Sequence, residues 1–160
     1  LHFTPEHLAA LAAQGVRQCQ VTLHVGLGTF QPVSVAEVRD HVMHSEAFDL
    51  PEASAALINE TRANGGRVIA IGTTAVRVLE TQGGADGRVR AGSGDTQIFL
   101  YPPYQPKVVD GLLTNFHLPC STLLMLVSTF ASRERVLAAY QQAIAERWRF
   151  FSYGDCMLLL

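Results

Sequence analysis

Histidine and glutamate stand two residues apart in the stretch MHSE, residues 43 to 46. In an extended segment, alternate side chains share a face, so His44 and Glu46 would point the same way. A carboxylate beside an imidazole suits a histidine oriented for acid/base chemistry. A surface hydrogen-bonded pair is the alternative. Metal binding is disfavoured, because His41, His44 and Glu46 match no standard ligand spacing and no cysteine is near.

A second polar group, TNFH, precedes an apolar run at residues 123 to 127. Asn115 and His117 would share a face at a strand end, with Phe116 directed into the core. Asp110 lies upstream, and Ser121 follows where the apolar helix is expected to start. These groups are candidates for an active-site wall. Alternatively, they satisfy backbone groups at a tight strand-to-helix turn.

The stretch GTTAVR, residues 72 to 77, follows an apolar strand and opens a helix. Free amides at a helix N-terminus attract anions, and the hydroxyls of Thr73 and Thr74 can add donors. Arg77 can share their helix face. The stretch therefore suits a carboxylate or phosphate site. An ordinary threonine cap with a solvated arginine is an equally good interpretation.

The stretch HVGLGT, residues 24 to 29, also follows a strand. It lacks the third glycine of a dinucleotide-binding fingerprint, and Pro32 interrupts any helix. Gly28 is therefore expected in a permissive turn. His24 and Thr29 are candidate ligand contacts, although such a histidine is often hydrogen-bonded within the fold.

Helices are predicted where caps and apolar periodicity coincide, and strands where apolar runs are bounded by turn residues. The expected helices start at residues 5, 51, 73, 121 and 132, and the expected strands cover 18–25, 67–71, 96–101 and 107–116. Residues 83–95 are expected to form a surface loop, and the tail a turn with an apolar end. The alternation indicates an α/β fold with a mixed, largely parallel sheet flanked by helices. Three polar strand ends would then form one rim, where such sheets bind ligands.

Length, charge and cysteine content favour a globular protein and disfavour several other classes. A chain of 160 residues with a net charge of −2 fits one globular domain and not a general polyanion binder. Three separated cysteines favour reduced thiols over a disulfide framework or zinc site. The apolar run at 123–130 is too short to span a bilayer. We therefore expect a cytoplasmic protein without a membrane or metal partner.

Seven collinear stretches resemble the S-adenosylmethionine:tRNA ribosyltransferase-isomerase family of queuosine biosynthesis. They are LHFTPE, VTLHVGLGTFQPV, MHSE, RVIAIGTTAVRVLE, TQIFLYPPY, VVDGLLTNFHLPCSTLLMLVSTF and WRFFSYGDCMLLL. The sequence departs from the family pattern at Pro103, Cys120 and Cys156. If the residue at position 120 normally contacts an anion, that contact is absent here.

The resemblance implies transfer and isomerisation of the ribosyl group of S-adenosylmethionine onto 7-aminomethyl-7-deazaguanine at the wobble position of tRNA. Adenine and methionine would leave, giving epoxyqueuosine-tRNA. S-adenosylmethionine is then a co-substrate, with no prosthetic group, and tRNA is the macromolecular partner of a monomeric enzyme. On this basis His44, supported by Glu46, is the candidate base, and His117, with Asp110 or Asn115, the acid or ribose-orienting group.

The remaining candidates are assigned to substrate binding: His24, Gly28, Thr29, Thr73, Thr74, Arg77, Asn115, Ser121, Tyr153 and Asp155. The resemblance implies that residues 1–160 form the C-terminal part of the catalytic α/β domain. The N-terminal part and an inserted β-barrel domain would lie outside this chain. Two alternatives stay open: an inactive tRNA- or nucleoside-binding fragment, and an S-adenosylmethionine-dependent methyltransferase.

Overall fold

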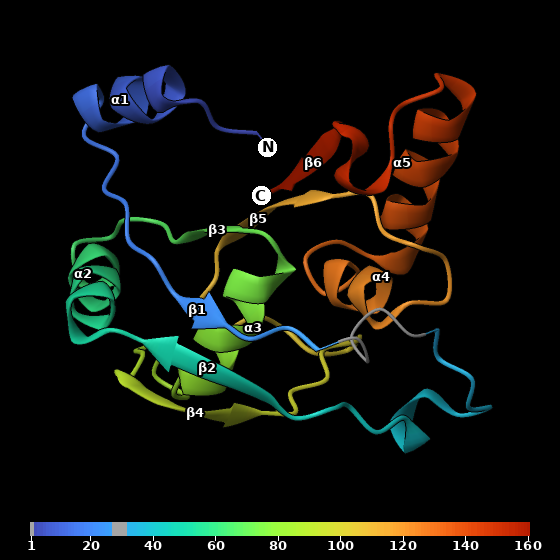
Figure 1. Cartoon of the computed structure of the whole chain (residues 1–160), viewed down its shortest axis with the longest axis horizontal. Helices are drawn as coiled ribbons and strands as arrows, with labels where there is room; N and C mark the ends of the chain where they lie inside the picture. Colours follow the sequence, from blue (N-terminus) through green and yellow to red (C-terminus); the bar gives the residue numbers. More distant parts are fainter. Residues whose placement is uncertain (1, 27–31) are drawn as a thin grey trace.

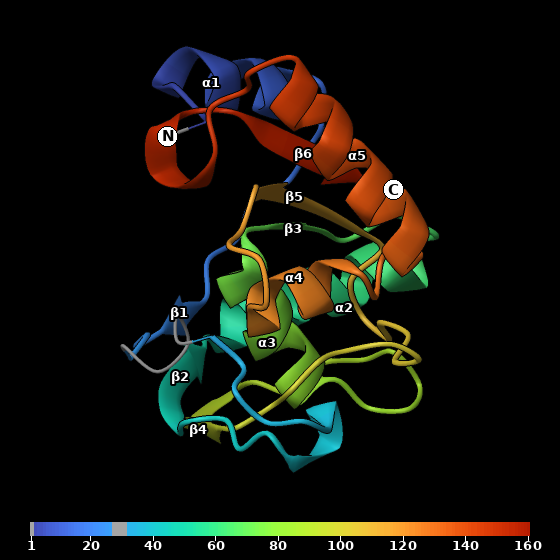
Figure 2. The same cartoon turned by 90° about the vertical axis from the view of Figure 1, so that its right-hand side faces the viewer.

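The computed structural model describes residues 2–26 and 32–160, which form two small sheets with helices between and around them (Figure 1). In Figure 2 the two sheets lie above and below a layer of three helices. These are α2 (Glu52–Ala63), α3 (Thr73–Gln82) and α4 (Thr122–Val127). The core fills the space between the layers, and its fully buried side chains include Leu50, Val76, Val78, Val108, Leu112, Phe116 and Val127.

The first sheet has the order β1 (Thr22–Leu23), β2 (Glu46–Leu50) and β4 (Gly92–Thr96), with both pairings antiparallel. β4 falls at the end of the expected surface loop, so the prediction of a strand at 96–101 was wrong in position. Its sequence, GSGDT, has little strand propensity. Pairing with β2 determines the strand, because Phe48 lies opposite Gly94, where no side chain obstructs its ring.

The second sheet has the order β3 (Ile69–Ile71), β5 (Gly111–Asn115) and β6 (Cys156–Leu159). β3 and β5 are parallel, and Ile71 pairs with Leu113. β6 returns antiparallel to β5, with Leu112 opposite Leu159. The C-terminal tail, expected only as a turn with an apolar end, therefore contributes an edge strand.

The α/β class with flanking helices is confirmed, but the pairings are less parallel than expected. Among the described residues only β3 and β5 pair in parallel. A parallel pair needs a crossover connection, which α3 and the residues after it provide. β2 instead enters a different sheet from β3, although only α2 and a short turn separate them. Alternation of strands and helices therefore did not produce one continuous parallel sheet.

The helices begin close to their expected caps. Thr4 caps α1 (Pro5–Ala13), Ser121 caps α4, and Ser132 caps α5 (Arg133–Ala145), each accepting a hydrogen bond from a backbone amide. The described residues also include two short 3₁₀ helices, η2 (Val38–Asp40) and η3 (Phe151–Tyr153). No helix in the described ranges is both long and apolar enough to cross a membrane.

Candidate functional site

The parallel pair β3 and β5 places two of the predicted polar segments at the same edge of the second sheet. β3 ends at Ile71 and β5 at Asn115, and the amide of Gly72 donates a 2.8 Å hydrogen bond to the carbonyl of Leu113. Gly72 has φ 89°, a conformation that glycine adopts without strain, and it turns the chain directly into α3. Thr73 and Thr74 are therefore brought beside the TNFH segment.

Helix α3 also connects this edge to the first sheet through a buried ion pair. The guanidinium of Arg77, on α3, donates to the carboxylate of Glu46, on β2, and both side chains are almost completely buried. The other carboxylate oxygen accepts a 2.8 Å hydrogen bond from the amide of Gly26, just after β1. Thr73 lies one helical turn before Arg77. The ion pair and the Gly26 hydrogen bond therefore fix the position of Gly26 relative to α3.

His117 lies two residues beyond β5 and is half-buried. Its Nε2 is 2.8 Å from the hydroxyl oxygen of Thr114, and its backbone amide donates to the phenolic oxygen of Tyr140 at 2.6 Å. Burial lowers the pKa of His117 to about 4, because the charged imidazolium is poorly solvated there. The imidazole is consequently neutral near pH 7.

Asn115 ties the end of β5 to the C-terminal turn. Its side-chain amide donates to the carbonyl of Phe151, and the amide of Phe151 donates to the carbonyl of Phe116 at 3.0 Å. The amide oxygen of Asn115 also lies 3.3 Å from Nε2 of His2. Asn115 therefore has a structural role at this turn, in addition to any contact with substrate.

The two candidates from SYGD lie in this C-terminal turn. Tyr153 is 73% exposed at the end of η3. Asp155 accepts hydrogen bonds from the backbone amide and the side chain of Arg149, and these bonds lower the pKa of its carboxyl group. Asp155 therefore stabilises the turn, and Tyr153 leaves its ring available to a ligand.

Helix α4 begins at the same side of the molecule. Ser121 accepts from the amide of Leu124 at 3.2 Å and donates to the carbonyl of Leu118 at 2.7 Å, so it caps the helix as well as being a predicted contact. Pro32 and Ser121 form an isolated antiparallel bridge, and Val33 donates to the carbonyl of Cys120 at 2.9 Å. The segment that begins at Pro32 is thereby hydrogen-bonded to the start of α4.

Other candidates are not brought together as expected. His44 is exposed, and no hydrogen bond joins it to Glu46 in the described part of the chain, since the buried carboxylate points toward α3 instead. His24 is exposed, and its amide pairs with the carbonyl of Ala47. Gly28 and Thr29 lie outside the described residues.

Asp110 stands at the opposite end of β5 from His117. All 5 residues of the strand lie between them, and at about 3.3 Å per residue these extend over roughly 16 Å. The carboxylate of Asp110 accepts from Arg62 at 3.1 Å and from the amide of Val68 at 2.8 Å. The structure therefore does not pair Asp110 with His117 and gives it an anchoring role at the start of β5.

Two contributors to this edge were absent from the sequence-based set. The hydroxyl of Thr114 contacts the imidazole of His117, and the hydroxyl oxygen of Tyr140 accepts a hydrogen bond from the backbone amide of His117. Thr114 has a detectable signal, because it precedes His117 by three residues at a tight turn. Tyr140 has none, since its position in α5 fits the apolar pattern of a core residue. No group of three potential metal ligands occurs among the residues that the structure describes.

Comparison with known proteins agrees with the family resemblance. The model of the family described as queuosine biosynthesis protein matches residues 1–159. The chain belongs to this family. It is 61% identical to the S-adenosylmethionine:tRNA ribosyltransferase-isomerase of Thiobacillus denitrificans, over 99% of the chain and 46% of that protein. The corresponding protein of Trichlorobacter lovleyi is 58% identical over 100% of the chain and 47% of its own length.

A solved structure supports the fold. The crystal structure of S-adenosylmethionine tRNA ribosyltransferase from Thermotoga maritima aligns with a TM-score of 0.79 and 42% identity, covering 99% of this chain and 50% of that one. This member of the queuosine biosynthesis family therefore spans about half the length of the curated relatives that it matches.

Proposed function

We propose that this chain supplies one half of the active site of an S-adenosylmethionine:tRNA ribosyltransferase-isomerase. The observation that carries the proposal is the meeting of TNFH and GTTAVR at the shared edge of β3 and β5, in a chain that matches the family over 1–159. The reaction would transfer and isomerise the ribosyl group of S-adenosylmethionine onto 7-aminomethyl-7-deazaguanine in tRNA. S-adenosylmethionine acts as co-substrate.

His117 is assigned to orienting the ribose. A histidine with a pKa near 4 is protonated in only about one molecule in a thousand at pH 7. It is therefore a poor proton donor to departing adenine, but a neutral imidazole can accept or donate a hydrogen bond to a ribose hydroxyl. Of the two roles expected for His117, this geometry favours the orienting one.

Helix α3 is assigned to the methionine carboxylate. Its first residues, Thr73 and Thr74, combine free helix amides with hydroxyl donors, and the helix dipole favours an anion there. Arg77 already faces the carboxylate of Glu46. We therefore assign Arg77 and Glu46 to positioning α3 and the segment after β1, and not to direct contact with substrate charge.

His44 is assigned to proton removal. The sulfonium of S-adenosylmethionine acidifies the neighbouring C5′–H, and a base must reach that proton. His44 is exposed on the approach to β2, two residues from the buried Glu46, so its imidazole can meet a substrate held at this side. Its orienting partner would have to come from outside the described residues or from the substrate.

Adenine release tests the proposal. The chain is assayed alone and as a chimera with the part of the Thiobacillus denitrificans relative that the match leaves out, using S-adenosylmethionine and tRNA bearing the aminomethyl base. We expect the chimera to release adenine. His44→Ala should reduce release at least about 100-fold, because it removes the proposed general base. His117→Ala should also reduce release, because the ribose loses an orienting contact. His7→Ala, on exposed α1, should change release little.

Other products would contradict the assignment. Formation of S-adenosylhomocysteine would indicate a methyltransferase, and full activity in both the His44 and His117 variants would exclude their assigned roles. A second candidate function, binding of tRNA or a nucleoside without catalysis, is favoured by the half-length match. It would be supported if the chain binds the tRNA but neither chain nor chimera releases adenine.

A further inference from the structure

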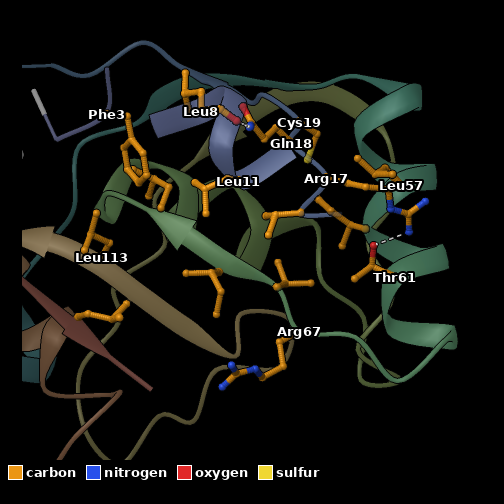
Figure 3. Close-up of a pocket in the computed structure, with 16 residues that line it drawn as sticks. Phe3, Leu8, Leu11, Arg17, Gln18, Cys19, Leu57, Thr61, Arg67 and Leu113 are labelled. Carbon is orange, nitrogen blue, oxygen red and sulfur yellow. Dashed lines mark hydrogen bonds between the residues drawn. The ribbon is translucent and has the colours of Figure 1, made fainter. Parts of the chain in front are cut away.

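An apolar groove runs along one side of the second sheet, away from the core (Figure 3). Its cavity has a volume of about 510 Å³, and its floor and walls come from β3, β5, β6, α1 and α2. The aliphatic side chains that define it include Leu8, Leu11, Leu57, Ile71, Leu113 and Leu158. Polar groups are confined to a few positions, among them Arg17 and Arg67.

The floor of the groove is a sheet face whose side chains the other described residues leave partly exposed. Along β3, Ala70 is 3% exposed on the core side, whereas Ile69 and Ile71 on the other face are 37% and 49% exposed. Leu158 of β6 is 56% exposed. Sheets with parallel pairs are normally covered on both faces, because their strands carry apolar residues on both sides. Here only one face is packed.

Helix α1 buries none of its residues against the rest of the described chain. It has 9 residues, none of which is buried, and a helix of this length is marginal in water without tertiary contacts. It is connected to the body by hydrogen bonds from the segment that follows it: Arg17 to Glu60 and Thr61, both at 2.8 Å. Figure 1 shows α1 standing apart from the layers, on the same side as β3.

The edges of the sheet are also open among the described residues. β3 and β6 each pair only with β5, which leaves one side of each strand without a strand neighbour. An open, apolar edge and face are the features to which another chain segment adds. The chain spans 47% of the Trichlorobacter lovleyi relative and 50% of the Thermotoga maritima protein, so a segment of comparable size is available in full-length members.

We propose that this groove is the docking surface for the half of the full-length enzyme that this chain does not span. That half lays aliphatic side chains between α1 and the exposed face of β3, β5 and β6. The inference rests on family membership and the exposed apolar face, and it is independent of the proposed catalytic roles. The proposal therefore makes predictions about the thermal stability of the chimera and the solvent accessibility of the groove, and none about catalytic activity.

The experiment uses the chimera with the unmatched part of the Thiobacillus denitrificans relative. Ile71→Lys, in the groove, is compared with Ile144→Lys on α5, which is 63% exposed and outside the groove. If the groove is covered, Ile71→Lys should lower the Tm by about 5 °C or more, and Ile144→Lys by less than about 2 °C. Ile71→Thr gives a graded version if the lysine variant does not fold.

Thiol labelling supplies a second readout. Cys19 lines the groove and is exposed in this chain. Maleimide should modify it at least about 10-fold more slowly in the chimera than in the isolated chain, relative to a cysteine introduced by Ala85→Cys at an exposed position. Both samples are first shown to unfold cooperatively.

Three results would overturn the proposal. Equal, small Tm shifts for Ile71→Lys and Ile144→Lys, with unchanged Cys19 labelling, would show an open groove. A chimera no more stable than the isolated chain would show that the added half does not pack there. Dimerisation that Ile71→Lys abolishes, measured by light scattering, would assign the groove to a second copy of the chain instead.

Discussion

Two buried carboxylates lie at α3, one contacting Arg77 from β2 and one on the helix itself, and they are stabilised in different ways. Glu46, from β2, faces the guanidinium of Arg77 and the amide of Gly26. Glu80, on α3 itself, accepts from the hydroxyl of Tyr104 at 2.7 Å and from the backbone amides of residues 107, 108 and 109 at 2.9–3.1 Å. One charge is neutralised by a cation, and the other is held by neutral donors.

The difference shows that a buried charge does not by itself identify reacting groups. The Glu80 cluster fixes the 104–109 loop and lies away from the polar strand ends. The Glu46 cluster lies beside them, but both of its charges already have partners, so it positions chain segments. The imidazole of His117 and the ring of Tyr153, by contrast, remain partly accessible. Chemistry is therefore expected at the rim that these anchors support.

Breaking the ion pair between Arg77 and Glu46 should have the largest effect on the free energy of unfolding. Arg77→Met leaves the Glu46 carboxylate buried without its cation, and removing one partner of a buried pair costs about 3–5 kcal/mol. Urea unfolding measures the loss in the free energy of unfolding. Arg133→Met, at an exposed position on α5, is the matched control and should stay within about 0.5 kcal/mol.

The double variant Glu46→Gln with Arg77→Met sharpens this test. It removes both charges, so it should be more stable than Arg77→Met alone. A single-variant loss under about 1 kcal/mol, or no recovery in the double variant, would contradict the proposed coupling.

Glu80→Gln should have the next largest effect. The substitution replaces one acceptor oxygen with an NH₂ group that faces donors, and an unsatisfied buried group costs about 1–3 kcal/mol. The loss should be smaller than for Arg77→Met, because no buried charge is left unpaired. Exposed Glu52→Gln, on α2, is the control, and the two free energies are compared by chemical denaturation. A Glu80→Gln loss that exceeds the Arg77→Met loss would reverse the comparison.

The sequence predicted the parts of the fold whose signals are local. Thr4, Ser121 and Ser132 mark helix starts by type and position, and the apolar run before Gly72 marks β3. The strand β4 could not be predicted in this way, because its glycine- and serine-rich sequence becomes a strand only by pairing with β2. β2 itself was obscured by Glu46, a charged residue at a buried position of an otherwise alternating strand.

The candidate site was predicted to a similar extent. TNFH and GTTAVR were found because polar residues end apolar strands, and the parallel pairing placed them together. The partnership of Arg77 with Glu46 was not predictable, since the residues are 31 positions apart and belong to different layers. His44 and Glu46 are two residues apart in the sequence, but His44 is exposed, whereas Glu46 is buried against Arg77. The contact with α3 that separates them could not be predicted from their spacing.

The pH dependence of stability tests the environment of His117. Its folded pKa, about 4, lies below the unfolded value of about 6.5, so the unfolded chain binds the proton first. Stability is therefore lost as pH falls from about 6.5 to 4, by about 2 kcal/mol between pH 7 and 4.5. His117→Gln should lack this part of the acid loss, whereas His7→Gln should retain it. Identical pH profiles of wild type and His117→Gln would contradict the burial argument.

Substitution of Tyr153 should have the smallest effect on the free energy of unfolding. It therefore distinguishes an accessible residue at the polar strand ends from the buried carboxylate clusters that support them. Its ring is 73% exposed, and Tyr153→Ala should change the free energy of unfolding by less than about 0.5 kcal/mol. If the ring contacts substrate, adenine release by the chimera should fall about 10-fold, mainly through a higher KM. Tyr153→Phe distinguishes the ring from the hydroxyl: retained activity indicates stacking, and a loss equal to that of alanine indicates a hydrogen bond. Unchanged kinetics in both variants would remove Tyr153 from the site and restrict the accessible rim to residues on β5, α3 and the segment before β2.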